Sequence, residues 1–190
     1  LPIYELFTRL LSQDITIEKY HGFGLKATLK KRMRGVRERM VNWQSSKKST
    51  QVGRDHYDIN TKVYETMLDS RMIYSCAYWE NAEDLETAQL QKLKMICEKL
   101  ELKKGERLLD MGCGWGGLAI YAAENYGVEV VGITISNQQM EYAASKSKEL
   151  PVKIIFADYR SKLIELEGEF DKIASIGMME HVGRKNDSTY

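Results

Sequence analysis

Cysteine and histidine are scarce in this sequence, and neither residue forms a recognisable pattern. The 190 residues include three cysteines and three histidines. The cysteines show neither the spacing of a disulfide framework nor, with the histidines, the spacing of a metal site. We therefore expect no bound metal and a reducing, cytoplasmic environment. These residues are Cys76, Cys97, Cys113, His21, His56 and His181.

Long apolar runs are also missing. No stretch reaches the roughly 18 apolar residues that a membrane-spanning helix needs, so we expect no such helix. A hydrophobic content of 43% and a charged content of 29% are typical of a globular protein. The length suffices for one sizeable core with a small appendage. No internal repeat is present, which excludes a repeat architecture.

Net charge is low, but its distribution is uneven. The sum is only +1, whereas residues 26–48 concentrate basic side chains opposed only by Glu38. Apolar residues recur there at steps of three and four, which predicts one helical face: Leu25, Leu29, Met33, Val36 and Met40. A basic amphipathic helix of this kind either lies on an anionic membrane surface or packs on another domain. Nucleic acid is not expected as a partner, because aromatic residues do not alternate with the charges.

The chain divides into two expected parts. Residues 1–52 form a helical basic appendage that ends in a Ser/Lys/Thr-rich linker at 45–50. Residues 53–190 form a second domain, which begins with helices over 57–68 and 85–100. After residue 105, strands and helices alternate, and this order predicts an α/β fold with a parallel sheet. The expected strands are 107–110, 128–133, 152–157 and 170–176, with helices over 117–126 and 136–149.

The most informative segment is Arg107-Leu-Leu-Asp-Met-Gly-Cys-Gly-Trp-Gly-Gly117. It reads as a buried strand that ends in a glycine-rich turn, followed at once by an apolar helix. Glycine lets the backbone approach a ligand closely, and the first N–H groups of the helix point toward it. The turn lies at the carboxyl end of a parallel strand, where such sheets bind ligands. The segment therefore predicts a nucleotide-like cofactor, with a turn that holds no ligand as the alternative.

Two cofactors compete for this turn. Gly112, Gly114 and Gly117 satisfy the G-x-G-x-x-G pattern of dinucleotide-binding proteins. That pattern expects an acidic residue at the end of the next strand, but Thr134 follows here without a carboxylate. Asp110, two residues before the first glycine, favours S-adenosylmethionine instead of NAD. Asp110 either takes part in cofactor binding or accepts hydrogen bonds from backbone N–H groups of the glycine turn.

Further blocks narrow the family. They are His56-Tyr-Asp58, Tyr74-Ser-Cys-Ala-Tyr-Trp79, Gly132-Ile-Thr-Ile-Ser136, Asp158-Tyr159 and Gly177-Met-Met-Glu-His-Val-Gly183. Together they closely resemble the cyclopropane-fatty-acyl-phospholipid synthases, which are class I S-adenosylmethionine-dependent methyltransferases related to the mycolic acid cyclopropane synthases. The resemblance runs from about residue 53 to the end and covers the N-terminal and central part of the family. The blocks at 74–79 and 180–183 are specific to that group, whereas the glycine turn is shared more widely.

The resemblance implies a set of cofactor contacts. Tyr74 and Ser75 would contact the methionine part, and the glycine turn would pass under it. Residues after the second strand would hold the ribose and adenine edge, and Asp158 or Tyr159 would meet the adenine. The full expected set is Tyr74, Ser75, Asp110, Gly112, Cys113, Gly114, Gly116, Thr134, Ile135, Gln139, Asp158 and Tyr159. Cys76 and Glu180 match positions that hold a bicarbonate ion, the family's catalytic base.

The implied reaction places demands on the site. Methyl transfer from a sulfonium to a cis double bond leaves a carbocation, which must be kept from water. Tyr74, Tyr78 and Trp79 would supply an electron-rich wall, since aromatic faces attract cations. Loss of a proton then closes the ring, and this step needs a positioned base, for which a buried Glu180 would orient bicarbonate. The alternatives are structural roles: Cys76 would be only a small buried hydrophobic residue, and Glu180 would cap a helix.

The implied function is methylene transfer from S-adenosylmethionine to unsaturated acyl chains of membrane phospholipids, at the inner surface of the membrane. Three alternatives stay open: a lipid methyltransferase that does not close a ring, an NAD-dependent dehydrogenase, and a non-catalytic cofactor-binding module. The family's sheet has seven strands and only four are expected here, so we expect a C-terminally truncated, incomplete sheet. An unpaired strand edge and an uncovered apolar face would favour association, such as a homodimer.

Overall fold

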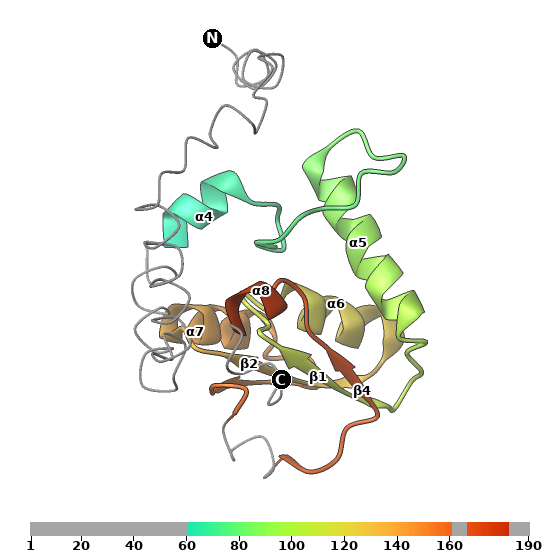
Figure 1. The fold of residues 1–190 in the computed structure, drawn as a ribbon, viewed down its shortest axis with the longest axis vertical. Helices are drawn as coiled ribbons and strands as arrows, with labels where there is room; N and C mark the ends of the chain where they lie inside the picture. Colours follow the sequence, from blue (N-terminus) through green and yellow to red (C-terminus); the bar gives the residue numbers. More distant parts are fainter. Residues whose placement is uncertain (1–60, 161–166, 183–190) are drawn as a thin grey trace, which may run out of the picture. The chain divides into compact units, whose positions relative to one another are not determined.

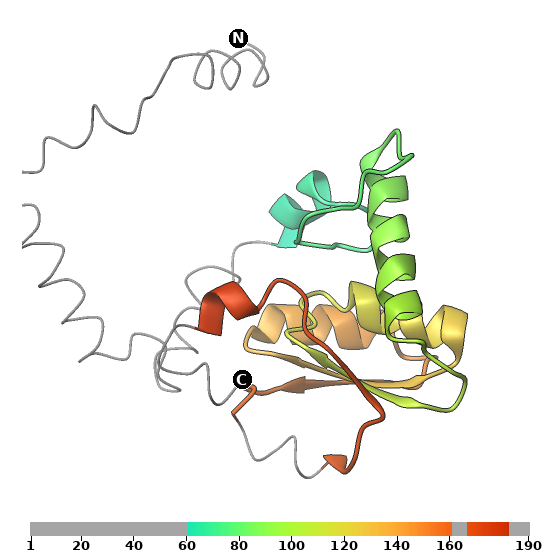
Figure 2. The same ribbon diagram turned by 45° about the vertical axis from the view of Figure 1, so that its right-hand side comes forward.

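The computed structural model describes residues 61–160 and 167–182 (Figures 1 and 2). The expected basic helix, the linker at 45–50 and the boundary at 52/53 lie outside the described residues, and so do residues 57–60. The division of the chain into two parts therefore stays a prediction. No helix within the described ranges has both the length and the apolarity needed to cross a membrane.

A four-stranded parallel sheet organises the described residues. Its strands are β1 (Arg107–Met111), β2 (Glu129–Thr134), β3 (Val152–Phe156) and β4 (Lys172–Ala174), in the order β3-β2-β1-β4. Leu108 pairs with Val130, and Val130 pairs in turn with Val152. All pairs are parallel, which confirms the Rossmann-like α/β architecture predicted from alternating strands and helices.

Two helices connect β1, β2 and β3 and lie on the same face of the sheet (Figure 2). Helix α6 (Gly117–Tyr126) joins β1 to β2, and α7 (Asn137–Lys146) joins β2 to β3. Gly127 ends α6 in a left-handed conformation with φ 64°, which glycine adopts without steric cost. The expected helix over 136–149 is shorter at both ends: Ser136 is its N-cap and accepts a hydrogen bond from the backbone N–H of Gln139, and the helix ends at Lys146 with Ser147 as its C-cap.

Side chains alternate between the two faces of the sheet. Leu108 and Val130 pack with α6 and with helix α5 (Leu85–Lys99), through Leu93 and Cys97 among others. Leu109 belongs to a second apolar cluster, with Val131, Ile133 and Ala157. This alternation follows from the two-residue period of a strand, and burial on both faces suits a parallel sheet.

Two short helices complete the described fold. Helix α4 (Thr61–Met67) packs through Tyr64 against Trp115 of the glycine turn, with ring centroids 5.3 Å apart. Helix α8 (Met179–Val182) follows β4. The strand expected over 170–176 extends only over 172–174. The residues that follow it, 176–178, line a cavity at the carboxyl ends of the other strands.

Candidate active site

A cavity of about 670 Å³ opens at the carboxyl ends of the strands. Six segments of the chain line it: residues 72–76, 92–96 of α5, the glycine turn, the end of β2, the end of β3, and residues 176–182. This is the edge at which parallel α/β sheets bind ligands. The volume lies within the range of pockets for small molecules and cofactors.

The glycine turn forms one wall of the cavity. Gly112 and Gly114 have φ of 80° and 55°, and both line the cavity. A Cβ atom at Gly114 would meet no atom within 4 Å, so the space beside it is open to a ligand. The backbone N–H groups of Gly112 and Cys113 donate to the carbonyl of Ile133, at 3.1 and 2.9 Å. The turn is therefore fixed by the neighbouring strand and not by the Asp110 side chain.

Gly116 has a different role from the other glycines of the turn. It is buried, is not part of the cavity lining, and has φ 85°. A Cβ atom there would lie 2.8 Å from Cβ of Ala143 on α7. The structure thus assigns Gly116 to the close approach of α6 and α7, whereas the sequence placed it with the cofactor contacts.

Asp110 is a buried carboxylate at the end of β1. It is 2% exposed, it lines the cavity, and no described residue donates a hydrogen bond to its Oδ2 atom. Burial raises the pKa of this carboxyl to about 7, because a charge is poorly solvated there. A buried acceptor without a protein donor is the group that a ligand hydroxyl or amine satisfies.

The end of β2 presents amide and hydroxyl groups where dinucleotide-binding proteins present a carboxylate. The Thr134 hydroxyl donates to Oε1 of Gln139 at 2.7 Å, and both side chains are buried. Ser136 caps α7 and so fixes the position of Gln139. Thr134, Ile135 and Gln139 all line the cavity. The hydrogen bond uses the amide oxygen of Gln139, which leaves its amide nitrogen to donate.

Asp158 and Tyr159 both line the cavity, as expected, together with a third residue that the sequence did not indicate. Arg160 donates from Nε to Oδ1 of Asp158 at 2.7 Å and from a terminal nitrogen to Oδ2 at 2.6 Å. Its guanidinium also lies 5.0 Å from the Tyr159 ring centroid. Two charge-assisted hydrogen bonds therefore join Arg160 to the Asp158 carboxylate, and this pair fixes the wall at the end of β3.

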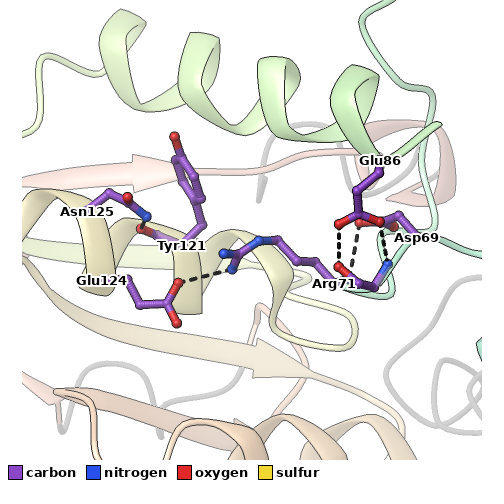
Figure 3. A network of polar contacts seen from close by, with 7 residues as sticks. Asp69, Arg71, Glu86, Tyr121, Glu124 and Asn125 are labelled. Atoms are coloured by element: carbon purple, nitrogen blue, oxygen red, sulfur yellow. Dashed lines mark hydrogen bonds and ion pairs between the residues drawn. The ribbon is translucent and has the colours of Figure 1, made fainter. Parts of the chain in front are cut away.

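The opposite wall, residues 69–76, is held by a network of side chains (Figure 3). The carboxylate of Asp69 accepts hydrogen bonds from the backbone N–H groups of Arg71 and Ile73, at 3.2 and 2.8 Å. Glu86 at the start of α5 accepts from the backbone N–H and the hydroxyl of Ser70. Arg71 pairs with Glu124 of α6 at 3.1 Å, with its guanidinium 5.4 Å from the Tyr121 ring centroid. The segment that carries Tyr74 is thereby tied to two helices.

Sequence reasoning missed two residues of α5 that contact this wall. Gln89 donates from Nε2 to the carbonyls of Ile73 and Ser75, at 3.3 and 3.0 Å. Lys92 donates from Nζ to Oγ of Ser75 at 2.8 Å and is only 6% exposed. Burial lowers the pKa of Lys92 to about 8. Lys92 stands four residues after Ala88 and beside Leu93, so its place on the buried helix face was a usable signal.

The expected catalytic pair lies at the cavity but is not enclosed. Cys76 and Glu180 both line it, and both are exposed in the described structure. The expectation that Glu180 is buried is therefore wrong, because α8, which carries it, is a single helical turn at the mouth of the cavity. Of the expected aromatic wall only Tyr74 lines the cavity, and it is 57% exposed. The Tyr78 hydroxyl bonds Glu80 instead, which holds its ring at the surface.

Comparison with known proteins assigns the family. Residues 44–190 match the family described as mycolic acid cyclopropane synthetase. The chain belongs to this family. The match includes the whole described fold and every residue of the candidate site, and it confirms the resemblance inferred from the motifs.

Two similar proteins have names that describe lipid-modifying enzymes. The chain is 50% identical over 184 residues to the cyclopropane-fatty-acyl-phospholipid synthase of Escherichia coli. The aligned residues make up 97% of this chain and 46% of the relative. It is 42% identical to a probable fatty acid methyltransferase of Pseudomonas putida, over 71% of this chain and 35% of the relative. The chain thus spans about half the length, or less, of these curated relatives.

Solved structures agree with the fold. The cyclopropane synthase MmaA2 of Mycobacterium tuberculosis superposes with a TM-score of 0.68 and 32% identity, over 74% of this chain and 50% of that one. A mycolic acid cyclopropane synthase in complex with SAH and CTAB gives a TM-score of 0.66 at 32% identity, with the same coverage. These two synthases therefore share the fold described above.

Proposed function

We propose that the protein containing this chain transfers a methylene from S-adenosylmethionine to a cis double bond of phospholipid acyl chains, forming a cyclopropane ring. One observation carries the proposal: a single cavity gathers the glycine turn, Asp110, the Thr134–Gln139 pair and the Tyr74 segment in a chain of the cyclopropane synthetase family. The chain spans only 46% of its E. coli relative, so the activity of the whole protein is a proposal.

The residues present fit the proposed cofactor. The open space at Gly114 admits a ligand against the backbone, and the Oδ2 atom of Asp110 offers an acceptor without a protein donor. The indole N–H of Trp115 is likewise buried without an acceptor among the described residues, and Trp115 lines the same cavity. Thr134, Ile135 and Gln139 would hold the ribose and adenine edge, while Tyr74 and Ser75 would contact the methionine part. S-adenosylmethionine supplies an electrophilic methyl group when bound.

The chain's own residues then serve three tasks. The glycine turn and the Thr134 segment orient the donor relative to the substrate, which lowers the entropic part of the barrier. Tyr74 offers an aromatic face toward positive charge on the acyl chain. Cys76 and Glu180, at the mouth of the cavity, would hold bicarbonate as the base that accepts the proton when the ring closes.

The substrate class implies a place of action. An acyl chain within a bilayer is reached from the membrane surface, so we propose a peripheral position at the inner membrane face. Tyr74, which lines the cavity, and Tyr78 and Trp79, which follow it in sequence, are exposed and supply apolar surface of the kind that contacts lipid. A homodimer is part of the same proposal.

Mass spectrometry of lipids tests the proposal. The protein is incubated with S-adenosylmethionine, bicarbonate and vesicles of cis-unsaturated anionic phospholipid. We expect acyl chains that gain the mass of one methylene unit. Unlike the alkene substrate, these products should not take up hydrogen on catalytic hydrogenation. Binding of S-adenosylhomocysteine without any product, from this chain and from a longer form alike, would reduce the function to a cofactor-binding module.

Methyl transfer without ring closure is the second candidate. It is supported by relatives whose names specify methyltransferases, including a sphingolipid C9-methyltransferase of Komagataella phaffii that is 40% identical over 68% of this chain. The same assay separates the two candidates. A product that gains the same mass but takes up hydrogen would be a methylated alkene, and it would replace the cyclopropane proposal.

A further inference from the structure

Lys92 is an isolated buried cation at the cavity. It stands on the inner face of α5 beside Leu93, and both residues line the cavity. Its Nζ atom donates to Ser75 Oγ at 2.8 Å and lies 3.4 Å from the Ser75 carbonyl oxygen. None of the ion pairs between described residues involves Lys92. A buried ammonium without a carboxylate partner is costly, so its retention calls for an explanation.

The hydrogen-bond directions around Ser75 are determined by chemistry. An ammonium group has three donors and no acceptor. The Ser75 oxygen therefore accepts from Lys92, and the hydroxyl hydrogen of Ser75 must be donated elsewhere. Gln89 already donates to the Ser75 carbonyl at 3.0 Å, which fixes the backbone on the same side. Within the described residues the Ser75 hydroxyl donates to no protein acceptor, and Ser75 lines the cavity.

The nearby carboxylate does not neutralise Lys92. Asp69 attracts the ammonium only at long range, and its oxygens already accept the backbone N–H groups of Arg71 and Ile73. Cys76, which forms no disulfide, also lines the cavity on this side. The wall around Ser75 therefore presents a polarised hydroxyl donor backed by a positive charge, which is complementary to an anionic group in the cavity.

We propose that Lys92 is a positioning residue for the ligand carboxylate: it holds Ser75 so that the Ser75 hydroxyl donates to the amino-acid carboxylate of the bound cofactor, and its charge stabilises that carboxylate. The inference rests on the proposed function and adds to it the residue that recognises the amino-acid end of the cofactor. It separates this end from the adenine end, which is held by the β2 and β3 wall.

Two ligands that differ in this one end test the inference. S-adenosylhomocysteine carries the amino-acid carboxylate, and 5′-methylthioadenosine lacks the amino-acid part. Affinities are measured by isothermal titration calorimetry for the unaltered protein, Lys92→Met and Ser75→Ala. We expect Lys92→Met to weaken S-adenosylhomocysteine about tenfold or more, the usual loss for a charge-assisted hydrogen bond, and to leave 5′-methylthioadenosine within about twofold.

Matched variants control the experiment. Lys94→Met removes an exposed lysine of the same helix and should change neither affinity. Lys92→Arg keeps the charge and the donors and should restore part of the affinity for S-adenosylhomocysteine. In the double variant, Ser75→Ala should cost little beyond Lys92→Met, because both act through one contact. If Lys92→Met lowers the melting temperature, Ser75→Ala carries the same test with a smaller change in the wall.

The outcomes are distinct. Equal loss of both ligands in Lys92→Met and in Ser75→Ala would assign Lys92 only to packing of the wall and overturn the inference. Unchanged S-adenosylhomocysteine affinity together with a higher bicarbonate requirement in the lipid assay would assign the charge to bicarbonate instead, and would also overturn it. If the unaltered protein binds 5′-methylthioadenosine but not S-adenosylhomocysteine, the inference fails while a nucleoside site remains. Binding of neither ligand overturns the proposed function, and the inference with it.

Discussion

The two walls of the cavity are built in different ways. The wall at the carboxyl ends of the strands is positioned mainly by backbone contacts: the glycine turn donates to the carbonyl of Ile133, and the register of the sheet fixes β1 and β2. The wall formed by residues 69–76 contains no regular secondary structure and is held by side chains of α5 and α6. A backbone wall transmits strain into the core when it is altered, whereas a side-chain wall loosens locally. Substitutions in the two walls should therefore separate stability from ligand binding.

The largest expected effect lies in the backbone wall, at Asp110. Its folded-state pKa of about 7 exceeds the ordinary value of 3.8, so between these pH values the folded protein holds a proton that the unfolded chain has lost. The stability contributed by this proton is complete below pH 3.8 and is lost as pH rises to about 7, a loss of about 4 kcal/mol. Asp110→Asn stays neutral, so its free energy of unfolding should lack this fall.

Urea unfolding of the ligand-free protein at several pH values between 4 and 8 measures this difference. The gap between Asp110→Asn and the unaltered protein should widen as pH rises through this window. Parallel curves for the two proteins would show that Asp110 is ionised in the fold, and that an unseen donor satisfies its buried oxygen.

Gly116 and Gly114 sharpen the comparison within the backbone wall. Gly116→Ala combines a positive φ with a Cβ contact of 2.8 Å to Ala143, and should destabilise by about 3 kcal/mol. Gly114→Ala adds a methyl group to open space, so it should cost only the strain of its φ of 55°, about 1 kcal/mol. The added methyl group should nevertheless hinder the ligand. Thermal unfolding and titration with S-adenosylhomocysteine should therefore rank the two variants in opposite orders.

In the side-chain wall, Asp69 carries the largest expected effect. It is buried and accepts two backbone N–H groups, which would lose their partner in Asp69→Ala. We expect a loss of about 2 kcal/mol in the free energy of unfolding, typical of removing the acceptor of buried donors. Ligand affinity should fall as well, because Tyr74 and Ser75 follow directly. A stability loss without any change in affinity would show that the two ends of the segment are uncoupled.

Sequence reasoning predicted the backbone wall well and the side-chain wall poorly, for a physical reason. The glycine turn, β1 and α6 follow from local signals: apolar alternation, glycines at positive φ and a helix that starts immediately after the turn. The boundaries of α6 agree with the predicted 117–126. The contacts of Lys92 with Ser75 and of Arg71 with Glu124 join residues 17 and 53 positions apart, and no local pattern encodes them. Arg160 was missed although it adjoins the predicted Asp158, because an arginine in sequence looks like any solvated charge.

The smallest expected effect on stability comes from removing the ion pair between Arg71 and Glu124, which joins the side-chain wall to α6. Arg71 and Glu124 are 30% and 40% exposed, so water screens their attraction, and Glu124→Gln should cost less than about 1 kcal/mol. The substitution keeps the size of the side chain while removing its charge, and Asn125 nearby on α6 offers a matched control, since Asn125→Ala removes only a bond to the Tyr121 carbonyl. If the network tunes the wall, Glu124→Gln should accelerate amide hydrogen exchange at residues 72–76 while the glycine turn keeps its protection. Equal exchange in both variants would mean that Asp69 and Glu86 suffice to hold the segment.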